Sequence, residues 1–407
     1  MPLTPNAIFE DLKNGDLDKS FAIELLKTLI ENSESIEARI ESIRNLNKIP
    51  LSADSTFKFL EHLLISDLNE DIRNITCLVI KNHYLDKALT PISWMLEHEK
   101  SLKCLLTGVT TLAEINTEDA KSILIDKLTN LYLKENKYNL KDIGKRNKLE
   151  SLTTQGLAEI LLNYYIVSFL KVKYKYIKYK YNNLGYITEL DLTNVDPQGI
   201  SLPNYLDSIF SLKHLRILDL RFNNLMKLQE ISYESNSLIS LDLSYNKLLS
   251  LPYSINNLKS LKILNLNSNR VRSLPNSLSK LTSLQILNLR NNILNNIPES
   301  IKSLKNLKDL DLHGNKINSI EFKLNNSIRE LQLGWNKFLK VPPNIKSLTS
   351  LITLDMSGNK LSILPKWINI FESLKVLNLY DNEIKELPKS IGNISSLEIL
   401  ILRNNKL

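Results

Sequence analysis

The sequence predicts an α/β solenoid with short parallel strands on its concave face, preceded by an all-α domain of helical repeats. Two patterns support this fold class: a long period of fixed length in the second half, and successive amphipathic helices in the first half. At 407 residues the chain is long enough for two or three domains. Hydrophobic residues make up 43% and charged residues 24%, which is the balance of a folded globular protein.

One pattern repeats from Leu215 onward. It reads L-x-x-L-x-L-x-x-N-x-L and continues, in the clearest copies, as x-x-L-P-x-x-I-x-x-L-x-x. The copies begin at Leu215, Leu238, Leu261, Leu284, Leu307, Ile328, Leu351, Leu374 and Leu397. Neighbouring copies are 23 residues apart, except for one interval of 21 between Leu307 and Ile328, and a degenerate copy begins at Ile187. A period held over so many copies indicates a repeat architecture.

This pattern resembles the leucine-rich-repeat family. Within that family it is similar to the 23-residue subclass found in Ras-associated signalling scaffolds and in plant disease-resistance receptors. The resemblance covers residues 187–407 and implies a horseshoe-shaped solenoid of about ten repeats. It also implies that the chain binds another macromolecule, with a small GTPase or its regulator as one class of partner.

Each position of the repeat has a physical interpretation. Leu261, Leu264 and Leu266 have the spacing of a short strand that turns its leucines inward, and neighbouring repeats must stack to bury them. An asparagine follows each strand, and its amide can satisfy backbone groups that the turn would otherwise bury. We therefore predict a structural asparagine ladder, made of Asn223, Asn246, Asn269, Asn292, Asn315, Asn336, Asn359, Asn382 and Asn405.

A second column holds prolines, which restrict the backbone on the convex side of the repeats. These are Pro252, Pro275, Pro298, Pro342, Pro365 and Pro388. We expect short helical turns or extended chain there, instead of long helices.

The position between the two inner leucines is almost always Asp or Asn. The column reads Asp191, Asp219, Asp242, Asn265, Asn288, Asp311, Gln332, Asp355 and Asn378. Such uniformity favours a solvated structural role over recognition, and it makes the concave face mildly acidic.

The next positions are more varied and form the candidate partner-binding site. They are Arg221, Phe222, Tyr245, Arg290, His313, Trp335, Tyr380 and Arg403. Aromatic residues and arginine dominate binding energy at protein interfaces. The alternative is that each side chain packs over the neighbouring loop, and the sequence leaves both possibilities open.

Residues 1–135 lack the leucine pattern and are interpreted as amphipathic helices. The predicted helices are Asp18–Glu31, Ser35–Leu46, Thr56–Ile65, Asp71–Lys81, Lys87–Glu97, Leu102–Ile115 and Glu118–Leu133. Asp54 and Thr117 are the expected N-caps. Three helices share an apolar and basic opening around Arg39, Arg73 and Lys103, with intervals of 34 and 30 residues. This stretch resembles HEAT or armadillo repeats, in which paired helices stack into a solenoid.

Cys77, His83, His98 and Cys104 are residue types that bind zinc, but their spacing matches no ordinary zinc site. We expect buried cysteines and surface histidines, with no metal and no cofactor. Two cysteines are too few for a disulfide framework, and the first residues lack a secretory signal, so we expect a cytoplasmic protein.

Residues 136–186 form a basic junction, interpreted as a linker and the N-terminal cap of the solenoid. Between Lys134 and Lys180 there are eleven basic and four acidic residues, which accounts for most of the net charge of +8. An apolar helix is expected over 151–169, and the alternation of Lys and Tyr over 171–181 predicts a strand. The same alternation could contact nucleic acid or an anionic membrane surface.

No nucleotide-binding, metalloprotease or serine-hydrolase motif occurs in the chain. The sequence therefore predicts a non-catalytic scaffold or adaptor of intracellular signalling that binds a protein on its concave face. The alternatives are an adaptor for nucleic acid or membrane through residues 171–181, or the sensing half of a longer protein. The chain ends inside a repeat, which favours a piece of a longer protein.

Overall fold

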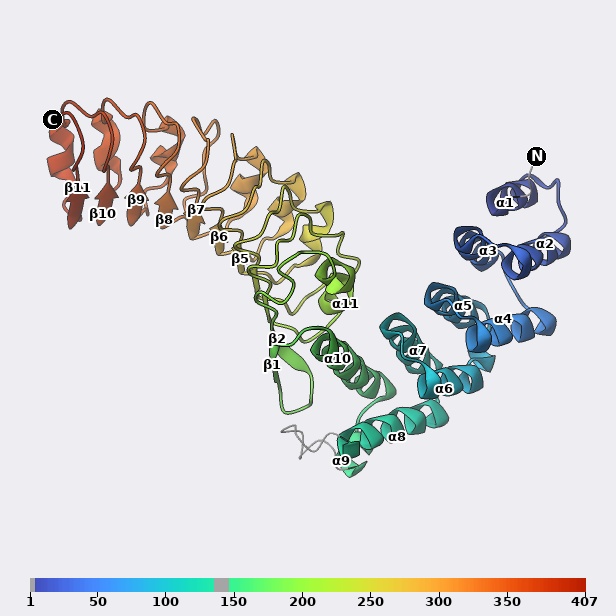
Figure 1. Cartoon of the computed structure of the whole chain (residues 1–407). Coiled ribbons are helices and arrows are strands. Elements are labelled where there is room, and N and C mark those ends of the chain that lie inside the picture. Colours follow the sequence, from blue (N-terminus) through green and yellow to red (C-terminus); the bar gives the residue numbers. More distant parts are fainter. Residues whose placement is uncertain (1–3, 135–145) are drawn as a thin grey trace. The chain divides into compact units, whose positions relative to one another are not determined.

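The computed structural model describes residues 4–134 and 146–407. The chain divides into two compact units, Met1–Phe169 with Asn183–Gly185 and Leu170–Asn182 with Tyr186–Leu407. The first unit is helical and the second is a solenoid with a parallel sheet (Figure 1). The predicted fold class is confirmed.

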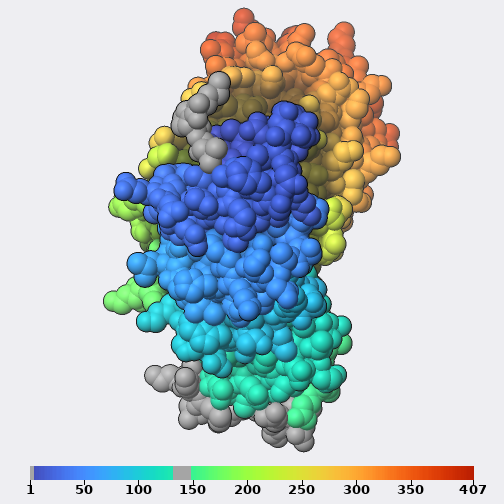
Figure 2. All heavy atoms as spheres, turned by 90° about the vertical axis from the view of Figure 1, so that its right-hand side faces the viewer, coloured from blue at the N-terminus to red at the C-terminus, as the bar shows by residue number. Residues whose placement is uncertain are grey.

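The helical unit consists of consecutive helices that pack against their neighbours. They are α1 (Pro5–Asn14), α2 (Lys19–Asn32), α3 (Ile36–Lys48), α4 (Asp54–Ser66), α5 (Glu70–His83), α6 (Leu89–His98), α7 (Leu102–Ile115), α8 (Glu118–Lys134), α9 (Arg146–Glu150) and the first part of α10 (Thr154–Lys173), with a 3-10 turn η1 (Leu85–Lys87) before α6. Helix α3 packs against α5, and α5 packs against α7. Figure 2 shows the surface of this unit as successive layers in chain order, from dark blue to teal.

Side-chain caps set where several of these helices begin. Thr117 Oγ1 accepts a hydrogen bond from the N–H of Ala120 at 3.2 Å, as predicted. The prediction for Asp54 is wrong, because Asp54 is the first helical residue of α4 and Ala53 occupies the cap position without a side-chain hydrogen bond. Helix α1 was not predicted, although Thr4 caps it and Pro5 occupies its first turn.

Two arginines tie the helix pairs together. Arg39 on α3 donates to the carbonyl of Ile30 at the end of α2, and it forms an ion pair with Asp67 after α4. Arg73 on α5 repeats this arrangement one pair later, because it donates to the carbonyl of Asp67 and binds Glu99 after α6 through two nitrogens. Each arginine thus covers the carboxyl end of one helix and pairs with the acid that follows the next even-numbered helix.

The junction departs from the prediction in its secondary structure. Helix α10 continues to Lys173, and the strand β1 is only Lys178–Tyr181, so the predicted strand over 171–181 is wrong in its first half. Leu170 and Tyr174 are both buried one helical turn apart, and this burial outweighs the alternation of Lys and Tyr. Strand β1 pairs antiparallel with β2 (Ile187–Asp191) and closes one edge of the sheet.

From β2 onward all strands are parallel and each pairs with its neighbour in sequence. They are β3 (Ile217–Asp219), β4 (Ser240–Asp242), β5 (Ile263–Asn265), β6 (Ile286–Asn288), β7 (Asp309–Asp311), β8 (Glu330–Gln332), β9 (Thr353–Asp355), β10 (Val376–Asn378) and β11 (Ile399–Ile401). The central leucines align across the sheet, as Leu264 pairs in register with Leu287, and both are fully buried.

The outer side of the solenoid carries short helical segments, and the strands line the inner, concave side (Figure 1). The segments are η2 (Leu202–Tyr205), α11 (Leu206–Phe210), η3 (Tyr253–Asn257), η4 (Asn276–Lys280), η5 (Glu299–Ser303), η6 (Pro343–Ser347), η7 (Lys366–Ile370) and η8 (Lys389–Asn393). Each of η3 to η8 follows a proline of the predicted column, so the expectation of short turns is confirmed. No helical segment lies between β7 and β8 among the described residues, which is where the repeat is two residues shorter.

Within the described ranges, no helix has both the length and the apolar character that crossing a membrane requires.

Candidate protein interface

The asparagine that ends each strand joins two repeats. Nδ2 of Asn292 donates to the carbonyls of Leu289 and Arg290 in its own turn and to the carbonyl of Leu266 in the preceding repeat. Its Oδ1 accepts from the N–H of Val271 in that preceding repeat at 2.9 Å. The same pattern recurs from Asn246 to Asn405, so the amides satisfy backbone groups that stacking would otherwise leave unpaired.

The Asp and Asn column between the inner leucines also has backbone partners. Asp242 Oδ1 accepts from the N–H of Ser244 at 2.9 Å, and Asn288 Oδ1 accepts from the N–H of Arg290 at 3.0 Å. Only short side chains that accept a hydrogen bond can close such a turn. This local bond accounts for the uniformity of the column without any ligand.

The position before each ladder asparagine has a left-handed backbone. Glycine, asparagine or aspartate suit this conformation, and Gly314, Gly358 and Asp381 occupy it in three repeats. In three others the residue is aromatic: Phe222 with φ 60°, Tyr245 with φ 55° and Trp335 with φ 52°. A bulky residue in this region costs free energy that its contacts must offset.

These three aromatic side chains are about half exposed. The rings of Phe222 and Tyr245 stack with their centroids 4.5 Å apart and their planes 12° apart. Trp335 covers Gly358 in the next repeat, where a Cβ atom would lie 2.6 Å from Trp335 Cδ2. One side of each ring therefore packs against a neighbouring repeat, as in the packing alternative raised from the sequence. The other side faces solvent.

The charged and polar members of the predicted site have closer partners. The side chain of Arg221 donates three hydrogen bonds to the carboxylate of Asp219 and lies 3.9 Å from Asp242. Hydrogen bonding to Asp219 raises the pKa of Arg221. Burial and the nearby charge of Arg290 lower the pKa of His313. In the last repeats, Tyr380 Oη accepts a hydrogen bond from the side-chain amide of Asn404 at 3.1 Å.

The structure therefore separates the predicted residues into groups. Phe222, Tyr245 and Arg221 lie in two adjacent repeats, whereas Trp335 lies four strands beyond Tyr245, about 19 Å away at the usual strand spacing. The three intervening repeats carry Ser268, Asn291 and Gly314 at the aromatic position. Arg403 is exposed in the last repeat.

Two further columns on the same face were missed from the sequence. One is the first residue of each strand, which is apolar and partly exposed in several repeats: Ile217, Ile263, Ile286, Val376 and Ile399. The other lies one residue earlier and is mostly basic: Arg216, Lys262, Lys308, Arg329 and Lys375. An alignment of the copies at these two positions would have revealed both columns, because neither is hidden by the leucine pattern.

The apolar column also contains Ser240, Thr353 and two acids. Asp309 and Glu330 are register partners on β7 and β8, so two carboxylates face each other across adjacent strands. Burial, followed by the charges of Glu330 and Asp311, raises the pKa of Asp309 to about 6. Burial also raises the pKa of Asp311. Like charges placed directly opposite destabilise a sheet, so this pair needs a compensating partner or a proton.

The basic junction has internal partners for its lysines. Lys180 Nζ lies 2.7 Å from Glu189, and Lys178 Nζ lies 3.8 Å from Asp191. Lys171 lies over the ring of Tyr179 at 5.2 Å. The interactions within the cap thus engage three of the cations that the nucleic-acid alternative would use.

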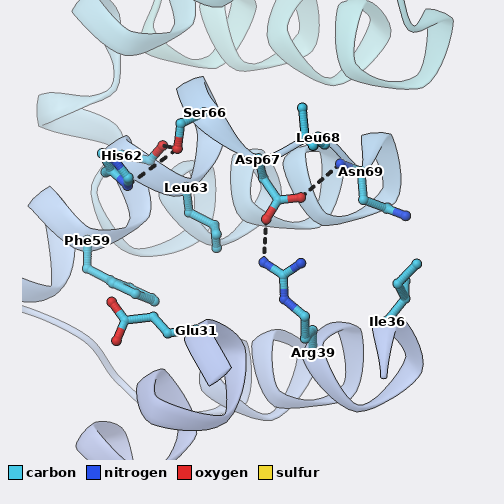
Figure 3. Close-up of a pocket in the computed structure, with 10 residues that line it drawn as sticks. All are labelled: Glu31, Ile36, Arg39, Phe59, His62, Leu63, Ser66, Asp67, Leu68 and Asn69. Carbon is cyan, nitrogen blue, oxygen red and sulfur yellow. Dashed lines mark hydrogen bonds and ion pairs between the residues drawn. The ribbon is translucent and has the colours of Figure 1, made fainter. Parts of the chain in front are cut away.

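The helical unit has a pocket of about 470 Å³ between two helix pairs (Figure 3). Arg39 and Asp67 pair with each other in its wall, and Ser66 lies beside His62. Leu68 is 98% exposed and Ile36 is 44% exposed at its edge. Because Arg39 and Asp67 already form an ion pair with each other, the pocket offers a ligand mainly apolar contacts.

The cysteines and histidines of the helical unit are dispersed. Cys77 and Cys104 are buried free thiols, and burial raises the pKa of each to about 12. His98 is exposed, but the expectation of a surface position is wrong for His83, which is half-buried and bonded to the carbonyl of Asn47 at 2.9 Å. Over residues 4–134 and 146–407, no group of three His, Cys, Asp or Glu residues could hold a metal ion.

Comparison with known families identifies the repeats. Residues 282–338 match a family described as "Leucine rich repeat", and so do residues 237–258, 350–370 and 373–394. The second half of the chain thus has the fold of a leucine-rich-repeat solenoid. No curated protein matches the chain as a whole or in part.

Among solved structures, the repeats are similar to a leucine-rich-repeat protein of Leptospira interrogans, with 33% identity and a TM-score of 0.50 over 56% of this chain and 58% of that protein. An internalin of Listeria monocytogenes is 26% identical with a TM-score of 0.43, over 49% of this chain and 57% of that one. The Arabidopsis receptor kinase HAESA, solved with the peptide hormone IDA and the co-receptor SERK1, is 24% identical with a TM-score of 0.45, over 59% and 45%. This chain thus spans less than two thirds of each protein. Leucine-rich repeats commonly serve as protein-interaction modules.

Proposed function

We propose that this protein is a non-catalytic scaffold that binds a protein partner on the concave face of its leucine-rich repeats. One observation carries the proposal: Phe222, Tyr245 and Trp335 are held half-exposed in a left-handed conformation that suits glycine better. An aromatic side chain there costs backbone strain, and only one face of each ring packs against the protein in the free state. Contact with a partner would offset it, and aromatic rings contribute strongly at interfaces.

The helical unit is the second part of the proposed scaffold. Its helix pairs and repeated Arg–carboxylate bonds support an interpretation as HEAT-like repeats. We place the scaffold in intracellular signalling, with a small GTPase or its regulator as the first partner class to test. The two free, buried cysteines suit a reducing cytoplasm.

A pull-down from native lysate tests the site. The bait variant replaces Phe222, Tyr245, Trp335 and Tyr380 with Ala. A matched control replaces Tyr233 and Tyr253, which are 51% and 71% exposed and lie outside the strands. We expect a partner that wild type and control retain and that the four-residue variant loses, followed by direct binding of the purified partner.

The variant must keep the wild-type thermal unfolding midpoint for this result to count. Equal recovery of the same partner by all three baits would assign binding to another surface and reject the proposed site. Recovery of nucleic acid instead of a protein, with strong loss of binding as salt rises, would favour the Lys and Tyr segment at residues 171–181 instead.

A further inference from the structure

Charged residues at the starts of the strands change from basic to acidic along the concave face. Arg216 and Lys262 precede β3 and β5, whereas Asp309 and Glu330 begin β7 and β8. A groove of about 370 Å³ crosses the starts of the strands β3 to β5. Arg216, Ile239 and Lys262 line it at equivalent positions of three repeats, together with His214 and the hydroxyls of Ser237 and Ser260. No carboxylate lines this groove.

Arg216 and Lys262 are exposed and form no ion pair within the described residues. Both serines are already engaged, since Ser237 donates to the carbonyl of Leu215 and Ser260 donates to the carbonyl of Asn236. The charge that the groove offers to a ligand is therefore positive.

Partly exposed isoleucines lie beside the groove at the starts of β3 and β5, with Ser240 between them on β4. Ile217 is 43% exposed, and Ile263 and Ile286 are partly exposed at the same position of β5 and β6. A ligand that reaches Arg216 and Lys262 from the concave side would also cover these isoleucines. Burial of these isoleucines stabilises the complex if the ligand presents apolar side chains to them.

The first strand position changes character at β7. Asp309 and Glu330 replace the isoleucines on β7 and β8, and neither forms an ion pair among the residues that the structure describes. Asp311 lies near Asp309 on β7. The preceding residues in the chain, Lys308 and Arg329, form no ion pair with either acid among the described residues, and Arg329 donates to the carbonyl of Ser350. From Lys262, which precedes β5, to Asp309 on β7 is two strands, about 10 Å, and from Arg216, which precedes β3, it is four strands, about 19 Å.

We propose that the concave face binds a linear protein segment that is acidic at one end, apolar in the middle and basic at the other. Its carboxylates pair with Arg216 and Lys262, its apolar side chains cover Ile263 and Ile286, and its Lys or Arg lies between Asp309 and Glu330. In extended conformation the acidic and basic residues are about three to six positions apart. This inference rests on the proposed function, because it names the chemistry of the partner for the same face.

The test is selection from a random linear peptide library displayed on phage, with the full chain as target. We expect enriched sequences that combine Asp or Glu with Lys or Arg at this separation, around an apolar residue. Fluorescence polarisation then measures each synthetic peptide against two variants, Arg216→Glu/Lys262→Glu and Asp309→Asn/Glu330→Gln. Each variant should weaken binding about tenfold or more, as for close charge pairs at interfaces.

Two controls separate this inference from the proposed function. Arg272→Glu/Lys280→Glu changes one exposed Arg and one exposed Lys outside the strands, and it should leave affinity unchanged. Peptides that lose binding in a Phe222→Ala/Tyr245→Ala variant but ignore both charge variants overturn the inference and keep the concave face as the site. Peptides that bind every variant equally overturn both. A selection that enriches no sequence also overturns the inference, which requires that a linear segment suffices.

Discussion

The side-chain amide of Asn292 donates a hydrogen bond to the carbonyl oxygen of Leu266, 2.9 Å away in the preceding repeat. Asn292 also accepts a hydrogen bond from the N–H of Val271 in that repeat. Together the two bonds connect the repeats and close the turn that contains Asn292. Stacking in a solenoid depends on such nearest-neighbour contacts, so loss of a single one should be measurable.

Asn292→Ala should lower the free energy of unfolding by about 1–3 kcal/mol, because buried carbonyl and N–H groups lose their partner. Chemical denaturation of the solenoid checks this. Asn295→Ala is the matched control, since Asn295 is exposed in the same repeat. Equal denaturation midpoints for the two variants would show that the ladder contributes nothing.

Gly358→Ala should destabilise the solenoid and displace Trp335. The new Cβ would meet Trp335 ring atoms at 2.6–2.8 Å, and φ of +60° suits glycine. We expect a loss of about 1–3 kcal/mol and a changed tryptophan fluorescence. Gly392→Ala is the control, because a Cβ atom added there would meet no heavy atom within 4 Å. A fluorescence spectrum identical to wild type would refute the contact between Trp335 and Gly358.

Arg73→Ala should destabilise the helical unit by about 3 kcal/mol, because it leaves the carboxylate of Glu99 buried without its partner. Burial alone would raise the pKa of Glu99, but hydrogen bonds from Arg73 and from the N–H groups of Ser101 and Lys100 lower it to about 2.

Thermal unfolding followed by helical circular dichroism measures the effect of Arg73→Ala. Arg44→Ala is the comparison, since Arg44 is 59% exposed in its pair with Glu41 and should contribute less than about 1 kcal/mol. Similar losses in both variants would mean that burial of the Arg73–Glu99 pair is unimportant.

Asp309→Asn should raise the unfolding midpoint at pH 7 and flatten its dependence on pH. The pKa of Asp309 in the folded protein is about 6, above the ordinary value near 4. Between these values the folded state holds a proton that the unfolded state releases, so stability falls as pH rises through this window. The penalty is complete above about pH 6.

Midpoints measured from pH 4 to 8 check the behaviour of Asp309→Asn. Glu372→Gln, an exposed acid outside the strands, is the control and should follow the wild-type curve. Parallel curves for wild type and Asp309→Asn would show that Asp309 titrates normally.

The repeats could be predicted closely from the sequence, because the leucine, asparagine and proline columns recur at a fixed interval. Each column has one local physical meaning: Leu264 must be buried, Asn269 must bond the turn, and Pro275 precedes a short helical segment. The helices of the first half followed from their apolar period, apart from α1, α9 and the start of α4.

The junction could not be predicted in the same way. The alternation of Lys and Tyr predicted a strand through Lys171, but contacts of Leu170 and Tyr174 with the rest of the fold keep this segment helical. Local propensity is weak compared with burial, so tertiary packing decided the boundary between α10 and β1.

The sequence by itself determined the period of the solenoid, the leucines of its core and the asparagines of its ladder, because these depend on contacts between identical positions of neighbouring repeats. Only the tertiary structure decided how the variable positions combine. Stacking brings Phe222 onto Tyr245 and Asp309 opposite Glu330, residues 23 and 21 positions apart that no local pattern relates. It also showed that Phe222, Tyr245 and Trp335 share a left-handed backbone, since that conformation is imposed by the turn and not by the aromatic side chain.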